Sequence, residues 1–147
     1  TADALLITQK NSSQKVKFLI DQLNQRKDPR AHEHTFEHRP WGRFEILRDT
    51  ADFKSKLIQV NPGQQLSYQS HQKRAEHWVI VRGHPEVVLN DVTHRLNPGE
   101  SIYIPMGAKH RIRNPHAKEL VEFVEVQVGT YFGEDDIVRY QDDYQRG

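Results

Sequence analysis

The sequence predicts an all-β domain, built as an antiparallel sandwich or barrel and preceded by a short strand–helix segment. From Trp41 onward, short apolar or alternating runs are separated by turns that contain Pro or Gly. Many short strands with regularly spaced turns are typical of antiparallel sandwiches and barrels. The length of 147 residues matches about one domain and is enough to bury a core.

The first 38 residues have a different character. The run Ala4–Ile7 is apolar and is predicted to be one buried strand. The polar run Asn11–Ser13 then supplies good N-cap residues for an amphipathic helix. The helix is indicated by apolar residues at helical spacing, and it is predicted to end at Asp28-Pro29. The apolar residues are Val16, Leu19, Ile20 and Leu23. The polar stretch after the helix is predicted to be a linker that could contain one strand.

The body of the chain, residues 39–147, is predicted to be one β domain. Pro and Gly divide it at turns such as Asn61-Pro62-Gly63 and Asn97-Pro98-Gly99. Between the turns, nine strands are predicted: Arg43–Leu47, Phe53–Val60, Gln65–Ser70, Glu76–Arg82, Glu86–Leu89, Val92–Leu96, Ser101–Ile104, His110–Arg113 and Glu119–Val128.

Composition excludes several classes of function. Lys and Arg number 21 against 20 Asp and Glu, so no basic excess favours binding to nucleic acid. No apolar run approaches the roughly 18 residues of a membrane span, and no signal-peptide pattern opens the chain. Because there is no Cys, disulfides and Cys-based zinc sites are excluded. These features are compatible with a cytoplasmic protein that binds neither nucleic acid nor membranes.

Two spaced blocks of residues predict a metal site. Six of the nine His fall between His71 and His116. Gln69 and His71 are two residues apart, so they share one face of a strand, and Glu76 opens the next strand. The second block places His110 at the start of a strand after a Pro-Gly bend. Two imidazoles, one carboxylate and one amide oxygen suit a divalent first-row metal.

The two blocks resemble the motifs of the cupin superfamily, whose double-stranded β-helix, or jelly-roll, barrels hold a metal. Gln69 departs from the pattern, because a His is usual at that position. Gln there, followed by His71, Arg74-Ala75-Glu76-His77-Trp78 and Gly83, is similar to the type II phosphomannose isomerases. The segments Arg39-Pro40-Trp41-Gly42 and Tyr131–Arg139 resemble the start and the close of that family's barrel, and Ala4–Leu23 resembles the end of a guanylyltransferase domain.

The resemblance implies the C-terminal part of a bifunctional mannose-1-phosphate guanylyltransferase/mannose-6-phosphate isomerase. The implied activity is interconversion of mannose 6-phosphate and fructose 6-phosphate for GDP-mannose supply in the cytoplasm. The implied cofactor is one divalent metal ion, with zinc ahead of cobalt, manganese, nickel and iron. The implied partners are the sugar phosphate, an upstream guanylyltransferase domain, and a second copy paired through the barrel sheets. Guanylyl transfer itself is not expected from these residues.

Cations for the substrate are predicted around the metal ligands. Lys73 and Arg74 lie on the turn between two ligand strands, and Lys109 precedes His110. Arg74 is predicted both to bind phosphate and to aid catalysis, since a guanidinium can bind phosphate through two hydrogen bonds. Arg139, in the closing segment, is a second catalytic candidate and could also meet the substrate's charge. The base stays open among Glu122, Glu125, Asp135, Asp136 and Lys109.

Strand alternation gives one further prediction, which concerns the direction of the side chains. Glu76, Trp78 and Ile80 are expected to face inward, whereas Arg111 and Arg113 are expected to face solvent.

Two other classes of function compete with the isomerase. A non-catalytic cupin module for dimerisation or sugar-phosphate binding would bind its ligand without turnover. A metal-dependent dioxygenase is disfavoured by Gln69, because cupin oxygenases use nitrogen-rich ligation of iron.

Overall fold

The chain divides into two compact units, residues 1–35 and residues 36–147. The computed structural model describes residues 5–26, 28, 31 and 35–144. Among these residues, the first unit contains the α-helix and the second contains the strands. The predicted boundary between residues 38 and 39 falls inside the first strand, which pairs along its whole length with the second strand.

The helix of the first unit is α1 (Val16–Gln25), and it follows one 3₁₀ turn, η1 (Ser13–Lys15). It begins just after the predicted N-cap run, although no side chain caps its first turn. At the end of the helix, the N–H of Arg26 donates a hydrogen bond to the carbonyl of Gln22 at 3.1 Å. The predicted stop at Asp28-Pro29 lies just beyond, and Pro29 is outside the described residues. None of the ten residues of α1 is buried.

The strand predicted at Ala4–Ile7 is wrong for the part that can be described. Ala4 lies outside the described residues, and residues 5–7 have no regular secondary structure. Leu5 and Ile7 are each 84% exposed. A strand needs a hydrogen-bonding neighbour, and no described strand pairs with this run. Its apolar composition indicated burial but carried no information about a pairing partner.

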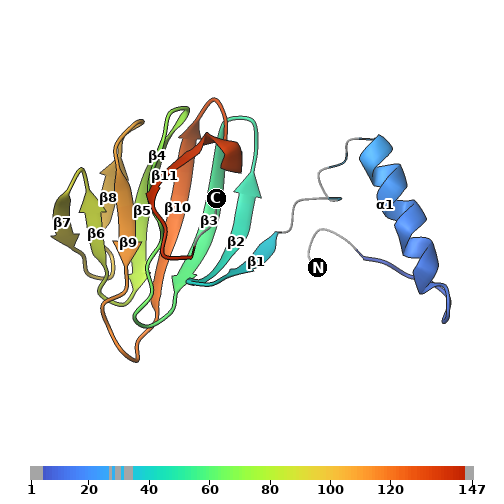
Figure 1. The fold of residues 1–147 in the computed structure, drawn as a ribbon, viewed down its shortest axis with the longest axis horizontal. Helices are drawn as coiled ribbons and strands as arrows, with labels where there is room; N and C mark the ends of the chain where they lie inside the picture. The colour runs from blue at the N-terminus through green and yellow to red at the C-terminus, as the bar shows by residue number, and fades with distance from the viewer. Residues whose placement is uncertain (1–4, 27, 29–30, 32–34, 145–147) are drawn as a thin grey trace. The chain divides into compact units, whose positions relative to one another are not determined.

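The second unit consists of two antiparallel sheets that face each other across the interior (Figure 1), which confirms the all-β prediction. The larger sheet has six strands in the order β1 (Phe36–Arg39), β2 (Gly42–Asp49), β3 (Phe53–Val60), β10 (Val121–Gly129), β5 (Arg74–Arg82) and β8 (Ser101–Ile104). The smaller sheet has five, in the order β11 (Ile137–Gln141), β4 (Tyr68–His71), β9 (His110–Arg113), β6 (Glu86–Leu89) and β7 (Val92–Arg95).

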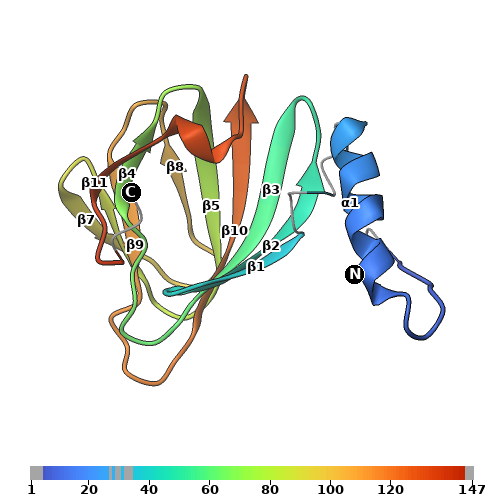
Figure 2. The same ribbon diagram turned by 45° about the vertical axis from the view of Figure 1, so that its right-hand side comes forward.

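Strand β11, the last strand of the chain, lies beside β4 at one edge of the smaller sheet (Figure 2). It is reached from β10 through the 3₁₀ turn η3 (Glu134–Asp136) and pairs with β4. Each of the nine predicted strands is present, with ends shifted by up to three residues. The largest shift is at the start of β4, because Gln65 forms only an isolated bridge with Arg113. The closing segment that contains β11 was not predicted to be a strand.

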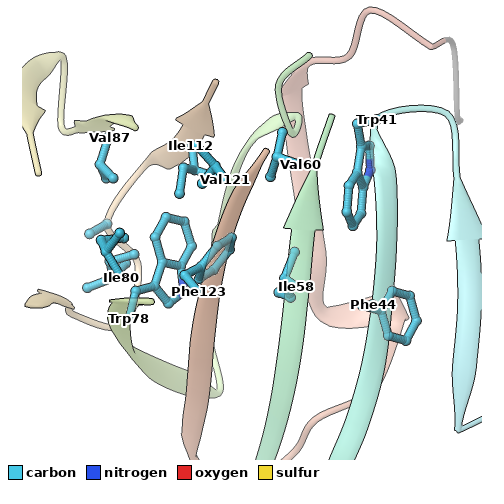
Figure 3. Close-up of a cluster of buried hydrophobic side chains, with 12 residues drawn as sticks. Trp41, Phe44, Ile58, Val60, Trp78, Ile80, Val87, Ile112, Val121 and Phe123 are labelled. Atoms are coloured by element: carbon cyan, nitrogen blue, oxygen red, sulfur yellow. The ribbon is translucent and has the colours of Figure 1, made fainter. Parts of the chain in front are cut away.

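Alternate residues of three neighbouring strands fill the apolar end of the interior (Figure 3). The rings of Trp78 and Phe123 lie 4.9 Å apart between centroids. Burial of one such side chain contributes about 1.5–3 kcal/mol. The cluster therefore holds β3, β5 and β10 in register, and these strands also carry polar residues of the site. Its members on these three strands are Ile58, Val60, Trp78, Ile80, Val121 and Phe123.

Gly42 sets the start of β2 beside β3. A Cβ at this position would collide with the backbone carbonyl of Gln59, and the φ of +153° is also unfavourable for L side chains. Trp41, the residue before it, is 5% exposed and accepts a hydrogen bond from the N–H of Asn61 at 2.9 Å. The Trp41-Gly42 pair therefore places β1 and β2 at the edge of the larger sheet.

Candidate metal centre

The four predicted metal ligands come together between the two sheets. Gln69 and His71 lie on β4, His110 lies opposite Gln69 on β9, and Glu76 reaches them from β5 of the other sheet. His71 Nε2 is 3.1 Å from Glu76 Oε1, and His110 Nε2 is 3.6 Å from Glu76 Oε2. The ligand atoms of the two His and Glu76 all lie within 4.8 Å of one another, and the three side chains are buried.

His110 is oriented to present one nitrogen to this centre. Its Nδ1 lies 2.9 Å from the carbonyl oxygen of Ala108, which accepts a hydrogen bond from the protonated nitrogen. That contact leaves Nε2 as the lone-pair nitrogen, and Nε2 is buried without a hydrogen-bond partner. Burial lowers the pKa of His110 despite the opposing charge of Glu76. A neutral imidazole with its second nitrogen bound to a carbonyl is the usual form of a metal-ligating His.

Gln69 completes the donor set after a rotation of its amide. Its Oε1 accepts a hydrogen bond from the Ser67 hydroxyl at 2.7 Å, and its Nε2 lies 3.4 Å from His71 Nε2. A metal binds an amide through its oxygen, so a 180° turn of the amide is required. Ser67 can then accept a hydrogen bond from Nε2, because a hydroxyl both donates and accepts. The residues present therefore fit a divalent cation.

Glu76 is the charged centre of the site. Burial raises the pKa of its carboxyl, but the hydrogen bond from His71 and the surrounding positive charges, that of Arg74 included, lower it by more, so the pKa lies well below the usual value. The carboxylate also accepts hydrogen bonds from Arg74 Nε at 3.4 Å, Trp78 Nε1 at 3.1 Å and Gln127 Nε2 at 3.2 Å. These contacts keep Glu76 ionised and in one orientation.

A second buried carboxyl, Glu125, lies beside the first on β10. It accepts hydrogen bonds from Trp78 Nε1 at 3.2 Å and Gln127 Nε2 at 2.8 Å, and it is 3.8 Å from Lys56 Nζ. Burial and the charge of Glu76 raise the pKa of Glu125 to about 8, although Lys56 and Arg74 oppose the shift. Glu76 and Glu125, whose pKa values are shifted in opposite directions, therefore accept hydrogen bonds from the same two side chains, Trp78 and Gln127.

Gln69, Glu76 and Glu125 line a cavity between the sheets. Residues of both sheets line it, and the charged members among them come from five strands and the η3 turn. Of the five candidates for the base, Glu125 lines the cavity, whereas the other four do not. Strand alternation explains the choice on β10, because the odd-numbered residues face inward and Glu122 faces out.

Of the four cations predicted to meet the substrate, two line the cavity and two do not. Arg74 and Arg139 line the cavity, and Arg74 is 2% exposed, donating from Nη1 to the carbonyl of Gly133 at 3.0 Å. The ammonium groups of Lys73 and Lys109 lie elsewhere, over the rings of Tyr131 and Tyr140 at 4.8 and 4.4 Å. Lys73 lies on an exposed turn, and Lys109 is the exposed neighbour of a buried ligand, so both face away from the interior.

Five polar residues that line the cavity were not predicted as site residues from the sequence: Arg39, Lys56, Ser67, Gln127 and Glu134. One signal could have identified Lys56. It lies on the same face of its strand as Ile58 and Val60, and that face points inward.

The double-sheet fold is that of a cupin, and the cluster of His71, Glu76 and His110 lies inside it. The chain resembles a solved double-stranded β-helix protein from Klebsiella pneumoniae, with a TM-score of 0.59, 20% identity and coverage of 67% of this chain and 83% of that one. It also resembles the cupin domain of Schizosaccharomyces pombe Cnp3, with a TM-score of 0.54, 18% identity and coverage of 66% of each chain. These likenesses confirm the predicted fold class.

The family follows from the sequence comparison. The model of the family "Mannose-6-phosphate isomerase C-terminal" matches residues 24–142, so the chain belongs to that family. It is 42% identical over 146 residues to the xanthan biosynthesis protein XanB of Xanthomonas campestris, covering 99% of this chain and 31% of that protein. It is 40% identical over 146 residues to the mannose-1-phosphate guanylyltransferase ManC of Salmonella typhimurium, covering 99% of this chain and 30% of that protein. The chain thus spans less than a third of these relatives.

Among the described residues, no helix is both long and apolar enough to cross a membrane.

Proposed function

We propose that the chain is a metal-dependent isomerase domain that interconverts mannose 6-phosphate and fructose 6-phosphate. The observation that carries the proposal is the cluster of His71, Glu76 and His110, buried between the sheets beside a cavity that Arg74 and Arg139 line. Gln69, His71, Glu76 and His110 would hold the cation. The family match supports the choice of reaction.

The reaction moves a proton between C1 and C2 of an open-chain sugar. A bound divalent cation supplies Lewis-acid stabilisation of the negative charge that develops on the sugar oxygens. With Glu76 as the one charged ligand among the four, the centre keeps a net positive charge. Arg74 adds a second cation, since its guanidinium lies 3.4 Å from Glu76 and borders the cavity. Positive groups already in place around a developing oxyanion lower the barrier.

Glu125 is placed to carry the proton. In the aldose-to-ketose direction its carboxylate takes the C2 proton, and the electrons of that C–H bond form the C1–C2 double bond of an enediolate. A proton then shifts from O2 to O1, Glu125 returns its proton to C1, and the carbonyl remains at C2. Trp78 and Gln127 orient the carboxylate. A cation bound beside Glu76 offsets the charge that raises the pKa of Glu125, which favours its ionised form.

The test is a coupled isomerase assay of the chain with added zinc, cobalt or manganese. We expect activity in the wild type and its loss in His71→Ala, His110→Ala and Gln69→Ala, with metal content measured on the same samples. His84→Ala is the matched control, because His84 lies on an exposed turn and contacts Asn97. Full activity in the triple variant would exclude the metal mechanism. Bound metal without turnover in the wild type would favour the non-catalytic module.

The domain's place in a longer protein is also a proposal. The relatives extend well beyond the matched region, and one of them is named a guanylyltransferase. We infer that residues 1–35 belong to the end of such an upstream domain, and that the isomerase supplies mannose 6-phosphate for GDP-mannose synthesis in the cytoplasm. Deletion of residues 1–35 should leave isomerase activity intact if they belong to another domain.

Pairing of two copies through the sheets stays a prediction, and the structure offers a surface for it. Val79, Val81 and Tyr103 are 40%, 52% and 51% exposed on the adjacent strands β5 and β8. We propose that a second copy covers this face of the larger sheet. Light scattering should show a dimer in the wild type and a monomer in Val79→Lys.

A further inference from the structure

Three cations line the cavity in addition to Arg74. They are Arg39 on β1 and Lys56 on β3 of the larger sheet, and Arg139 on β11, where it pairs with the proposed metal ligand Gln69. Neither the metal ligands nor the proton transfer described above requires Arg39 or Arg139. A cavity that collects such cations beside a reactive centre is suited to hold an anionic part of the substrate.

Arg39 reaches into the cavity from the edge strand. Its guanidinium carbon lies 5.7 Å from the centre of the Phe44 ring, which itself lines the cavity on β2. Its Nη2 is 3.0 Å from Glu37, a half-exposed carboxylate of the same strand. The ring holds the guanidinium over the sheet by a cation–π contact, and the other nitrogens have donors to spare, since a guanidinium has five N–H groups.

Arg139 approaches from the opposite sheet. Its Nε is buried and has no hydrogen-bond partner, and its Nη2 lies 3.7 Å from the exposed carboxylate of Glu134. A buried donor without a partner is costly unless a ligand or water satisfies it. Arg139 therefore has an unused donor in the cavity, and its one charged neighbour, Glu134, can be displaced into solvent.

Lys56 lies beside Glu125, its partner on the neighbouring strand β10. Its Nζ is 5.0 Å from the centre of the Phe44 ring and 3.8 Å from Glu125. It is 8% exposed. Along the larger sheet, the charged side chains that line the cavity come from β5, β10, β3 and β1, and Phe44 on β2 lies between the last two of these strands.

The cavity connects the metal ligands with these cations, because Gln69 and Glu76 line it together with Arg39 and Arg139. A hexose phosphate reacts at C1 and C2 and carries its phosphate on C6. A substrate bound with C1 and C2 at the metal ligands therefore extends its phosphate into the same cavity, toward the Arg39 and Arg139 guanidinium groups.

We propose that Arg39 and Arg139 form the phosphate subsite, which rests on the function proposed above. The phosphate would lie between the two guanidinium groups, with Glu37 and Glu134 displaced from them. Lys73 and Lys109, which the sequence favoured, would take no part. The residue that begins the Arg39-Pro40-Trp41-Gly42 segment would thus be a substrate-binding residue, delivered to the cavity by β1.

The experiment compares Arg39→Gln and Arg139→Gln with Lys73→Gln and the surface control Arg95→Gln, which is 86% exposed in its side chain. Binding of mannose 6-phosphate and of unphosphorylated mannose to the metal-loaded chain is measured by calorimetry. Loss of one charge-assisted, forked contact predicts about 10- to 100-fold weaker binding of mannose 6-phosphate in the two cavity variants. Mannose binding, metal content and the affinities of both controls should be unchanged. Arg39→Lys should recover part of the loss, because it restores charge but not the fork.

Two outcomes separate this inference from the isomerase proposal. If the wild type binds mannose 6-phosphate without turnover and the cavity variants lose that binding, the phosphate subsite stands and the isomerase activity does not. If the wild type is an active isomerase and both folded cavity variants keep its KM and its affinity for mannose 6-phosphate, the subsite is wrong. Equal weakening of mannose and mannose 6-phosphate would also overturn it, because the arginines would then act on the fold of the cavity.

Discussion

The interior of the β unit has two ends, and the same strands build both. At one end the inward side chains are polar or charged, and at the other they are apolar. On β5 the change falls between Glu76 and Trp78, and on β10 it falls between Glu125 and Phe123. On β3 it falls between Lys56 and Ile58. On each of three adjacent strands, two consecutive inward-facing residues thus mark the change from the site to the core.

Trp78 stands at this boundary and belongs to both ends. Its ring packs against Phe123, while its N–H lies 3.1 Å from Glu76 and 3.2 Å from Glu125. Buried charges cost free energy unless they are paired and hydrogen-bonded, whereas buried apolar side chains supply it. The apolar end therefore stabilises the strands, and the polar end depends on this rigidity to hold its groups in position.

The largest expected effect is on turnover at the polar end. Glu125→Gln keeps the size of the side chain but removes the group that takes the proton, so kcat should fall by about 10²- to 10⁴-fold. Stability should change little. Steady-state kinetics and thermal melts check both. Glu122→Gln, on the outward face of the same strand, is the control, and an unchanged kcat in Glu125→Gln would contradict the assignment.

The apolar end should respond in the opposite sense. Phe123→Ala removes a fully buried ring, and the free energy of unfolding should fall by about 3–5 kcal/mol. Val128→Ala, on the exposed face of β10, should cost less than about 1 kcal/mol. Urea denaturation measures both variants. A loss below about 1 kcal/mol in Phe123→Ala would show that the apolar cluster does not carry the stability of the sheet.

Metal should stabilise the fold through the polar end. A cation at 100 times its Kd stabilises the folded state by about 2.7 kcal/mol. We therefore expect zinc to raise the Tm of the wild type and of His84→Ala, and to have no effect on the Tm of His110→Ala. Calorimetry with and without a chelator is the measurement. An equal rise in His110→Ala would place the cation outside the proposed centre.

The smallest effect tests the boundary residue. Trp78→Phe retains an aromatic ring against Phe123 but removes the donor that Glu76 and Glu125 share. Loss of that hydrogen bond should lower the free energy of unfolding by about 1–2 kcal/mol. Tyr103→Phe, half-exposed on β8, should change it by less than about 0.5 kcal/mol. If urea denaturation gives the same free energy of unfolding for the two variants, the hydrogen bonds of Trp78 to the site do not contribute to stability.

Much of the site could be predicted because it depends on local geometry. Gln69 and His71 share a face by strand alternation alone, and the turn that follows brings Glu76 close to them. His110 was included because its Pro-Gly context resembles a known motif. These four residues do lie together in the structure, and their role as ligands stays a prediction.

The direction of the cations could not be predicted in the same way. Lys73 and Lys109 are near the ligands in sequence, yet aromatic rings hold their ammonium groups outside the cavity. Arg39 and Lys56 are far from the ligands in sequence and line the cavity. The contact of Lys56 with Glu125 depends on the pairing of β3 with β10, two strands separated by more than half of the unit.

The sequence by itself determined the strand-and-turn pattern, the inward phase of each strand and the type of metal ligands, because these depend on neighbours within a few positions. Only the tertiary structure decided which strands adjoin, and therefore that Glu125 lies beside Glu76 and that Arg39 and Arg139 face one cavity. The physical reason is that a strand's edges accept any partner of suitable register, so the choice of neighbour is made by the packing of the whole sheet and not by the strand's own residues.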